Sequence, residues 1–79
     1  METITIYGRR SCGFCMRAVQ LCEHRGLPYE YIDMPSQGMD KDDVAEIVGR
    51  PVATVPQVLV GDRLVGGYDE FSRYVQDTL

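Results

Sequence analysis

The chain of 79 residues lacks three things: an even set of cysteines, long apolar runs and clustered basic residues. Three cysteines are an odd number, which excludes a complete disulfide framework within the chain. No apolar run approaches the roughly 20 residues that span a bilayer. The N-terminal stretch METITIYG has no basic flank followed by a long apolar region, so a signal peptide is not expected. These absences favour a cytoplasmic protein with no membrane partner.

The charge distribution argues against a further class of function. The formal net charge is −4, and only residues 1–26 carry a local positive excess. Nucleic-acid binding requires a basic patch or stripe, so it is not expected. The hydrophobic fraction of 44% and the charged fraction of 25% are typical of an ordinary globule. A chain of this length can support one hydrophobic core, and we predict a single domain over residues 1–79.

Hydrophobic periodicity divides the first half of the chain into strand, helix and strand. Residues 3–7 and 29–33 are rich in β-branched and aromatic residues, which favours two strands. Between them, residues 15–25 have the period of a helix, and Gly26 is a suitable C-terminal cap. Its apolar residues recur at i, i+3, i+4 and i+7: Cys15, Ala18, Val19 and Cys22.

The second half predicts a helix, a hairpin and a final helix. Asp40, with Asp43 three residues later, resembles a capping box, and Gly49 ends this helix. The segment QVLVGDRLVGG predicts two strands joined by a tight turn at Gly61–Asp62. Three residues form the expected apolar side of the second helix: Val44, Ile47 and Val48. Four form that of the last helix: Phe71, Tyr74, Val75 and Thr78.

The order β-α-β-α-β-β-α predicts an α/β fold. The first two strands should be parallel, because a helix connects them, and the last two antiparallel. A mixed four-stranded sheet with helices on both faces then buries every apolar side.

The segment RRSCGFCMRA places Cys12 and Cys15 two residues apart, where the first strand meets the first helix. A disulfide between them closes too short a loop to stabilise the fold much. Zinc would need further ligands, and Cys22 and His24 are the nearest. However, about 10 Å of helical rise separates Cys15 from Cys22, so the two cannot share an ion. We therefore expect no metal centre of this kind.

Redox chemistry fits the same positions better. Cys12 lies at the N-terminus of the helix, where unpaired N–H groups and the helix dipole favour a thiolate. Arg9, Arg10 and Arg17 add positive charge around it. Cys15 lies about one turn later and can attack a mixed disulfide formed on Cys12. The pattern predicts a reactive dithiol, whereas Cys22 on the apolar side of the helix is expected to be buried and inert.

Three motifs together resemble the glutaredoxin family. They are CGFC after the first strand, TVPQV at residues 54–58 and GGYDEF at residues 66–71, and they cover nearly the whole chain in family order. The resemblance implies a thioredoxin-like fold and glutathione-dependent reduction of protein disulfides and of protein–glutathione mixed disulfides. It also implies that Cys12 attacks, that Cys15 resolves, and that glutathione is the reductant.

By the same resemblance, a set of residues should bind glutathione. Arg9 should pair with a glutathione carboxylate, and Val55, before a cis-proline at Pro56, should pair with the cysteinyl part. The turn at Gly67 should receive the γ-glutamyl end, because a helix N-terminus offers N–H groups to a carboxylate. The full set is Arg9, Phe14, Thr54, Val55, Pro56, Gly67, Tyr68 and Asp69.

The sequence also departs from the commonest family pattern. Many dithiol glutaredoxins have C-P-Y-C, whereas CGF followed by serine marks monothiol relatives that hold iron–sulfur clusters with glutathione. An alternative function is therefore a scaffold in which Cys12 from two copies and two glutathiones hold a [2Fe–2S] cluster. This chain keeps Cys15, so the dithiol enzyme is the main prediction. We expect a monomer, with ribonucleotide reductase as one candidate protein partner.

Overall fold

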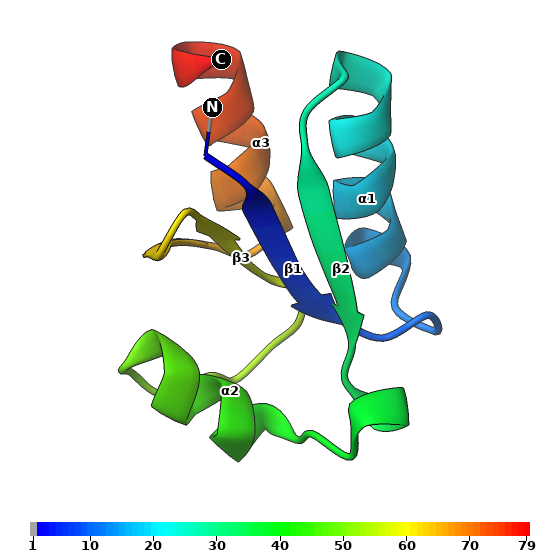
Figure 1. Cartoon of the computed structure of the whole chain (residues 1–79), viewed down its shortest axis with the longest axis vertical. Coiled ribbons are helices and arrows are strands. Elements are labelled where there is room, and N and C mark those ends of the chain that lie inside the picture. Colours follow the sequence, from blue (N-terminus) through cyan, green and yellow to red (C-terminus); the bar gives the residue numbers. More distant parts are fainter. Residues whose placement is uncertain (1) are drawn as a thin grey trace.

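The computed structural model describes residues 2–79 and contains the predicted elements in the predicted order (Figure 1). Their bounds are β1 (Ile4–Gly8), α1 (Gly13–Arg25), β2 (Tyr29–Asp33), α2 (Lys41–Val48), β3 (Gln57–Val60), β4 (Arg63–Gly66) and α3 (Tyr68–Thr78). A short 3₁₀ helix at Pro35–Gln37 lies between β2 and α2. Within the described part of the chain, no helix is long and apolar enough to cross a membrane.

The four strands form one mixed sheet in the order β2-β1-β3-β4. β1 runs parallel to β2, with Ile4 opposite Tyr29, and antiparallel to β3, with Ile6 opposite Val58. β3 and β4 form the predicted antiparallel hairpin. Gly61 in its turn has a φ of 62°, a conformation that glycine adopts without steric cost.

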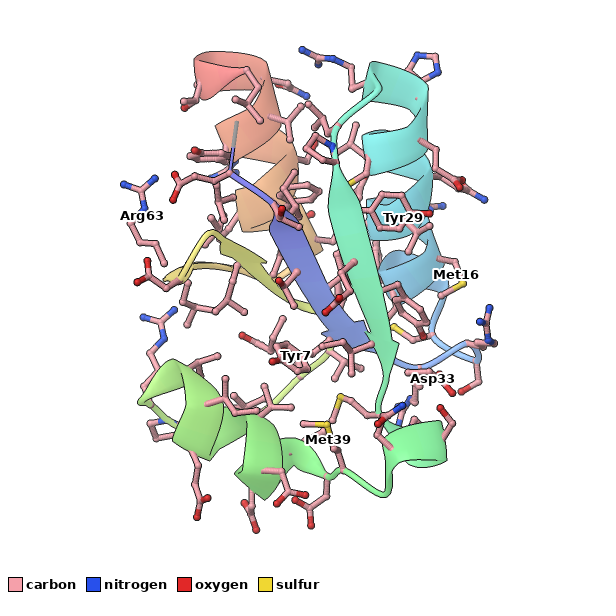
Figure 2. The ribbon with its side chains drawn as sticks, in the orientation of Figure 1. Tyr7, Met16, Tyr29, Asp33, Met39 and Arg63 are labelled. Atoms are coloured by element: carbon pink, nitrogen blue, oxygen red, sulfur yellow. The ribbon has the colours of Figure 1, made fainter. Side chains whose placement is uncertain are left out.

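The sheet separates two hydrophobic cores, because successive side chains of a strand point to opposite faces. Ile6 belongs to the larger core with α1 and α3, whereas Tyr7 belongs to the smaller core with α2. Figure 1 shows α1 and α3 beside each other and α2 apart from them, and Figure 2 shows Tyr7 and Met39 on the α2 side. The larger core consists of Ile4, Ile6, Ala18, Cys22, Leu27, Val58, Val60, Phe71 and Val75. The fold is the predicted thioredoxin-like arrangement.

Two residues of the predicted apolar sides lie in solvent instead. Ile47 is 53% exposed, because α2 packs into the smaller core through Val44 and Val48 instead. Thr78 is exposed because it lies in the last turn of α3, beyond Val75, the last buried residue of that helix. Periodicity correctly identified these helices but overestimated the width of their buried sides.

Candidate redox site

Cys12 lies at the N-terminus of α1, as predicted, and its sulfur caps the helix. The backbone of Cys12 is extended, with φ −93° and ψ 115°, and its Sγ accepts a hydrogen bond from the N–H of Cys15 at 3.3 Å. The thiol also donates to the carbonyl oxygen of Val55 at 3.6 Å. Cys12 is partly exposed. Cys12 therefore lies at the helix N-terminus and at the surface of the protein.

Cys15 is fully buried in the first turn of α1, with 0% of its surface exposed. Burial, together with the hydrogen bond to Cys12, raises the pKa of Cys15 to about 12, so this thiol keeps its proton at neutral pH. Cys22 lies in the larger core, where burial raises its pKa to about 11, in agreement with the predicted inert thiol. All three cysteines are free thiols. One of them is accessible and two are shielded.

A cleft of about 280 Å³ brings three distant segments together. It contains every residue of the predicted binding set except Arg9. Its lining residues are Phe14, Thr54, Val55, Pro56, Gly67, Tyr68, Asp69 and Glu70. The cleft joins the start of α1 and the start of α3 to the loop before β3, and Val55 at its edge touches Cys12.

The loop before β3 has the geometry that the resemblance implies. The Val55–Pro56 peptide bond is cis. The side-chain amide of Gln57 donates to the carbonyl oxygen of Thr54 at 2.8 Å, which closes the loop over the first residue of β3. The Val55 carbonyl oxygen, which accepts from Cys12, therefore lies in a loop that the hydrogen bond between Gln57 and Thr54 holds in place.

Aromatic rings line the α1 and α3 sides of the cleft. The ring centroids of Phe14 and Tyr68 are 5.8 Å apart, and the Arg17 guanidinium lies 5.3 Å from the Phe14 centroid. Phe14 is 52% exposed, so much of its ring is open to solvent at the cleft. An apolar portion of a ligand in this cleft would contact both rings.

Two arginines near the site, Arg9 and Arg10, occupy different places. Arg9 lies outside the cleft and lines a neighbouring hollow of about 400 Å³, which shares Val55 with the cleft. Arg10 lies 5.5 Å from the centroid of the Tyr31 ring, away from the cleft. The pKa of Tyr31 is raised to about 12 by burial and by the hydrogen bond that its hydroxyl donates to Asp33. Of these two arginines, only Arg9 lines a hollow that adjoins the cleft.

Sequence reasoning missed two residues that shape the site. Glu70 accepts a hydrogen bond from the N–H of Gly67 at 2.8 Å, so this N–H is already occupied. A glutamate three residues after a helix N-cap is a known capping pattern, so this contact was predictable. The ammonium of Lys41 donates to the carbonyl oxygen of Ala53 at 2.9 Å, which ties the loop before β3 to the start of α2. No local pattern predicts that second contact.

The metal-ligating side chains of residues 2–79 do not form a metal-binding cluster. No group of three or more histidine, cysteine, aspartate or glutamate side chains is arranged to hold a metal ion among these residues.

Comparison with known proteins identifies the family. A profile of the glutaredoxin family matches residues 4–65. The chain is 37% identical to Glutaredoxin 1 of Escherichia coli K12 over an alignment of 84 residues, which covers 100% of this chain and 98% of that protein. The chain belongs to the glutaredoxin family. It is also 33% identical to a glutaredoxin of Haemophilus influenzae, across 94% of this chain and 91% of that protein.

Solved glutaredoxin structures have the same fold. The structure of oxidised E. coli glutaredoxin superimposes with a TM-score of 0.84 at 35% identity, and the match covers 98% of this chain and 96% of that one. Glutaredoxins are thiol–disulfide oxidoreductases, and the Cys12–Cys15 pair is the dithiol that such a reaction needs. The resemblance seen in the three sequence motifs is thereby confirmed at the level of family, fold and redox function.

Proposed function

We propose that this glutaredoxin uses glutathione to reduce protein disulfides and protein–glutathione mixed disulfides. The observation that carries the proposal is the pairing of an accessible thiol at a helix N-terminus with a buried thiol one turn later, beside a cleft of ligand size. The Cys12 sulfur accepts a hydrogen bond from the N–H of Cys15 at the helix N-terminus, and a cysteine thiolate is the nucleophile in thiol–disulfide exchange.

The reaction begins when the Cys12 thiolate attacks one sulfur of the substrate disulfide. A new bond forms between Cys12 and that sulfur, and the other sulfur leaves as a thiolate that takes a proton. In a protein disulfide, the Cys15 thiol then gives up its proton, and its sulfur attacks Cys12 Sγ. The Cys12–Cys15 disulfide forms, and the second substrate thiol leaves. Two glutathione molecules reduce this disulfide and leave as glutathione disulfide.

A glutathionylated protein needs only Cys12. Attack on the glutathione sulfur releases the protein thiol and leaves glutathione on Cys12, and a second glutathione then displaces it as glutathione disulfide. The pKa of about 12 supports this division of labour, since Cys15 stays protonated while Cys12 makes the first attack.

Glutathione would bind along the cleft with its three parts at separate contacts. The cysteinyl part would lie along the Val55 backbone beside Cys12, and its glycine carboxylate would reach toward Arg9. The γ-glutamyl end would lie at the start of α3. Because Glu70 occupies the N–H of Gly67, the carboxylate there would be left the N–H groups of Tyr68 and Asp69. The Asp69 carboxylate would pair with the α-ammonium group.

The proposed setting follows the sequence expectations. The protein acts as a single domain and a monomer in the cytoplasm, on disulfide-containing or glutathionylated proteins, with ribonucleotide reductase as one candidate. Its similarity to other glutaredoxins along the whole chain supports this setting.

The test is glutathione-coupled reduction of a glutathionylated peptide and of a protein disulfide by the wild type, Cys12→Ser and Cys15→Ser. Cys12→Ser should be inactive on both substrates, whereas Cys15→Ser should lose mainly the protein disulfide reaction. A wild type that is inactive on both substrates would overturn the proposal. Visible absorbance of that inactive, freshly purified protein would favour the [2Fe–2S] scaffold instead.

A further inference from the structure

The last residue of β1 makes an unusually close approach to the buried thiol. A Cβ atom placed on Gly8 would lie 2.7 Å from Cys15 Sγ and 2.9 Å from Cys15 Cβ. The Tyr31 ring lies on another side of the same point, with its Cε1 atom at 3.5 Å. Non-bonded carbon atoms normally stay about 3.5–4.0 Å apart. Only a residue without a side chain leaves room for Cys15 at this depth.

The backbone conformation of Gly8 does not itself require glycine. Five glycines of residues 2–79 have a positive φ, and Gly8 is not one of them. Space is therefore the reason for a glycine at this position. Because the Cβ of Cys15 is fixed by the helix backbone, rotating the thiol would relieve only part of an overlap. A methyl group on Gly8 would have to push the first turn of α1 away from β1.

That first turn carries the whole redox centre. Cys12 caps it, Cys15 lies inside it, and the N–H of Cys12 donates to the carbonyl oxygen of Arg9 at 3.0 Å. Arg9 directly follows Gly8, so the end of β1 leads straight into the turn that positions Cys12 and the start of α1. The spacing between this strand end and α1 then sets the depth of Cys15.

We propose that Gly8 is a positioning residue for the second step of the reaction, because it leaves the room that holds the Cys15 thiol buried beside Cys12 until Cys12 carries a substrate. The inference rests on the proposed function. In the step concerned, the bond between Cys15 Sγ and Cys12 Sγ forms as the bond between Cys12 Sγ and the substrate sulfur breaks. The Cys15 proton goes to solvent, and the substrate thiolate takes one up. The one-thiol reaction on glutathionylated substrates does not use this step.

The experiment compares Gly8→Ala with the wild type on both substrates. Reduction of the protein disulfide should fall about tenfold or more, since displacing a reacting group by about 1 Å can cost that much. Reduction of the glutathionylated peptide should fall less than reduction of the protein disulfide, because it uses Cys12 alone and does not need the Cys15 step. The Cys15 thiol should also react faster with iodoacetamide in reduced Gly8→Ala than in the wild type, measured by mass spectrometry of the peptide that contains it.

Two further variants make the result specific to the Gly8–Cys15 contact. Gly13→Ala adds the same methyl group where, apart from the adjoining residues and the backbone of α1 itself, nothing lies within 4 Å, so alkylation of Cys15 should match the wild type. If Gly8→Ala does not fold, the double variant Gly8→Ala/Cys15→Gly removes both close contacts and should restore folding. A double variant that stays unfolded would overturn the inference.

Outcomes for the two proposals are distinguishable. Equal loss of both reactions in folded Gly8→Ala, or unchanged alkylation of Cys15, would overturn the role of Gly8 and leave the proposed function intact. An inactive wild type would overturn the proposed function, and the alkylation rates would still decide whether Gly8 sets the depth of Cys15.

Discussion

The free backbone N–H groups at the N-termini of α1 and α2 are capped by different side chains. At α2, the Asp40 carboxylate accepts from the N–H of Asp43 at 3.0 Å, and the Asp43 carboxylate accepts from the N–H of Asp40 at 2.9 Å. Asp42 adds a second carboxylate to that first turn. At α1, the cap is the sulfur of Cys12, and the first turn contains no acidic residue.

The difference shows what each helix terminus does. Carboxylates satisfy the free N–H groups of α2 and interact favourably with its dipole, so the field there stabilises the helix. At α1, the cap is the sulfur of a partly exposed cysteine, which is one of the two thiols of the redox pair. Cysteine is not among the preferred N-cap residues, so this terminus gives up some helix stability.

The largest expected effect comes from giving α1 the cap of α2. Cys12→Asp should reduce activity on both substrates by at least about 10³-fold, because the nucleophile is gone. The free energy of unfolding should stay equal or rise by up to about 1 kcal/mol, because aspartate is a better cap. Coupled reduction assays and urea unfolding of the same preparations measure both quantities.

The counterpart at α2 is the control for that experiment. Asp40→Ala should lower the free energy of unfolding by about 1 kcal/mol through loss of the cap. A Cys12→Asp protein that is less stable than Asp40→Ala would show that α1 is not capped in the same way.

A second, smaller effect is a loss of stability at alkaline pH, which arises from the thiols that α1 buries and α2 does not. α1 buries Cys15 and Cys22, whereas α2 buries only Val44. The thiol pKa values are raised from 9.0 to about 12 and about 11, so the folded chain keeps protons that the unfolded chain loses. Stability is therefore complete below about pH 9 and should fall as the pH rises toward about 11 or 12, at up to about 1.4 kcal/mol per pH unit for each thiol.

Urea unfolding across this alkaline range measures the slope, and Cys22→Ala identifies its source. The variant should lose stability less steeply above pH 9 than the wild type, because one raised thiol pKa is removed. Parallel curves for the two proteins would assign the alkaline loss to other groups.

The smallest expected effect comes from adding one carboxylate to the first turn of α1. Gly13→Asp places a negative charge near Cys12, at a position that is exposed and has space around it. Alkylation of Cys12 at neutral pH and low salt should slow by about twofold to fivefold, which corresponds to the usual strength of a charge at a helix terminus.

Gly13→Asn provides the uncharged control of nearly the same shape. The difference between Gly13→Asp and Gly13→Asn should shrink as salt is added, because exposed charges are screened. Equal alkylation rates for the two variants at low salt would mean that a charge in the first turn of α1 does not act on the Cys12 sulfur.

Local patterns predicted most of the fold. The glycine caps Gly26 and Gly49 have φ values of 65° and 80°, as helix C-terminal caps require, and the Asp40 capping box is present. The position of Cys12 was also predictable, since the strand, the turn and the helix are adjacent in sequence. These features depend on neighbouring residues, so the sequence alone contains them.

Features that depend on distant contacts were not predictable in the same way. Periodicity could not reveal that Ile47 is exposed, because it does not say how closely a helix approaches the sheet. The close approach of Gly8 to Cys15 and the anchoring of Ala53 by Lys41 require the folded geometry. The cleft itself was located through a family resemblance rather than through residue spacing.

The cleft has one more consequence, for selectivity. Its walls come from segments near Phe14, Val55 and Tyr68 that meet only in the folded chain, whereas the two thiols are neighbours in sequence. Unfolding would separate the walls but leave the thiols together. A partly unfolded molecule would thus keep the two thiols adjacent in sequence but lose the cleft that surrounds them, so selectivity between ligands depends on long-range folding, whereas the proximity of the thiols does not.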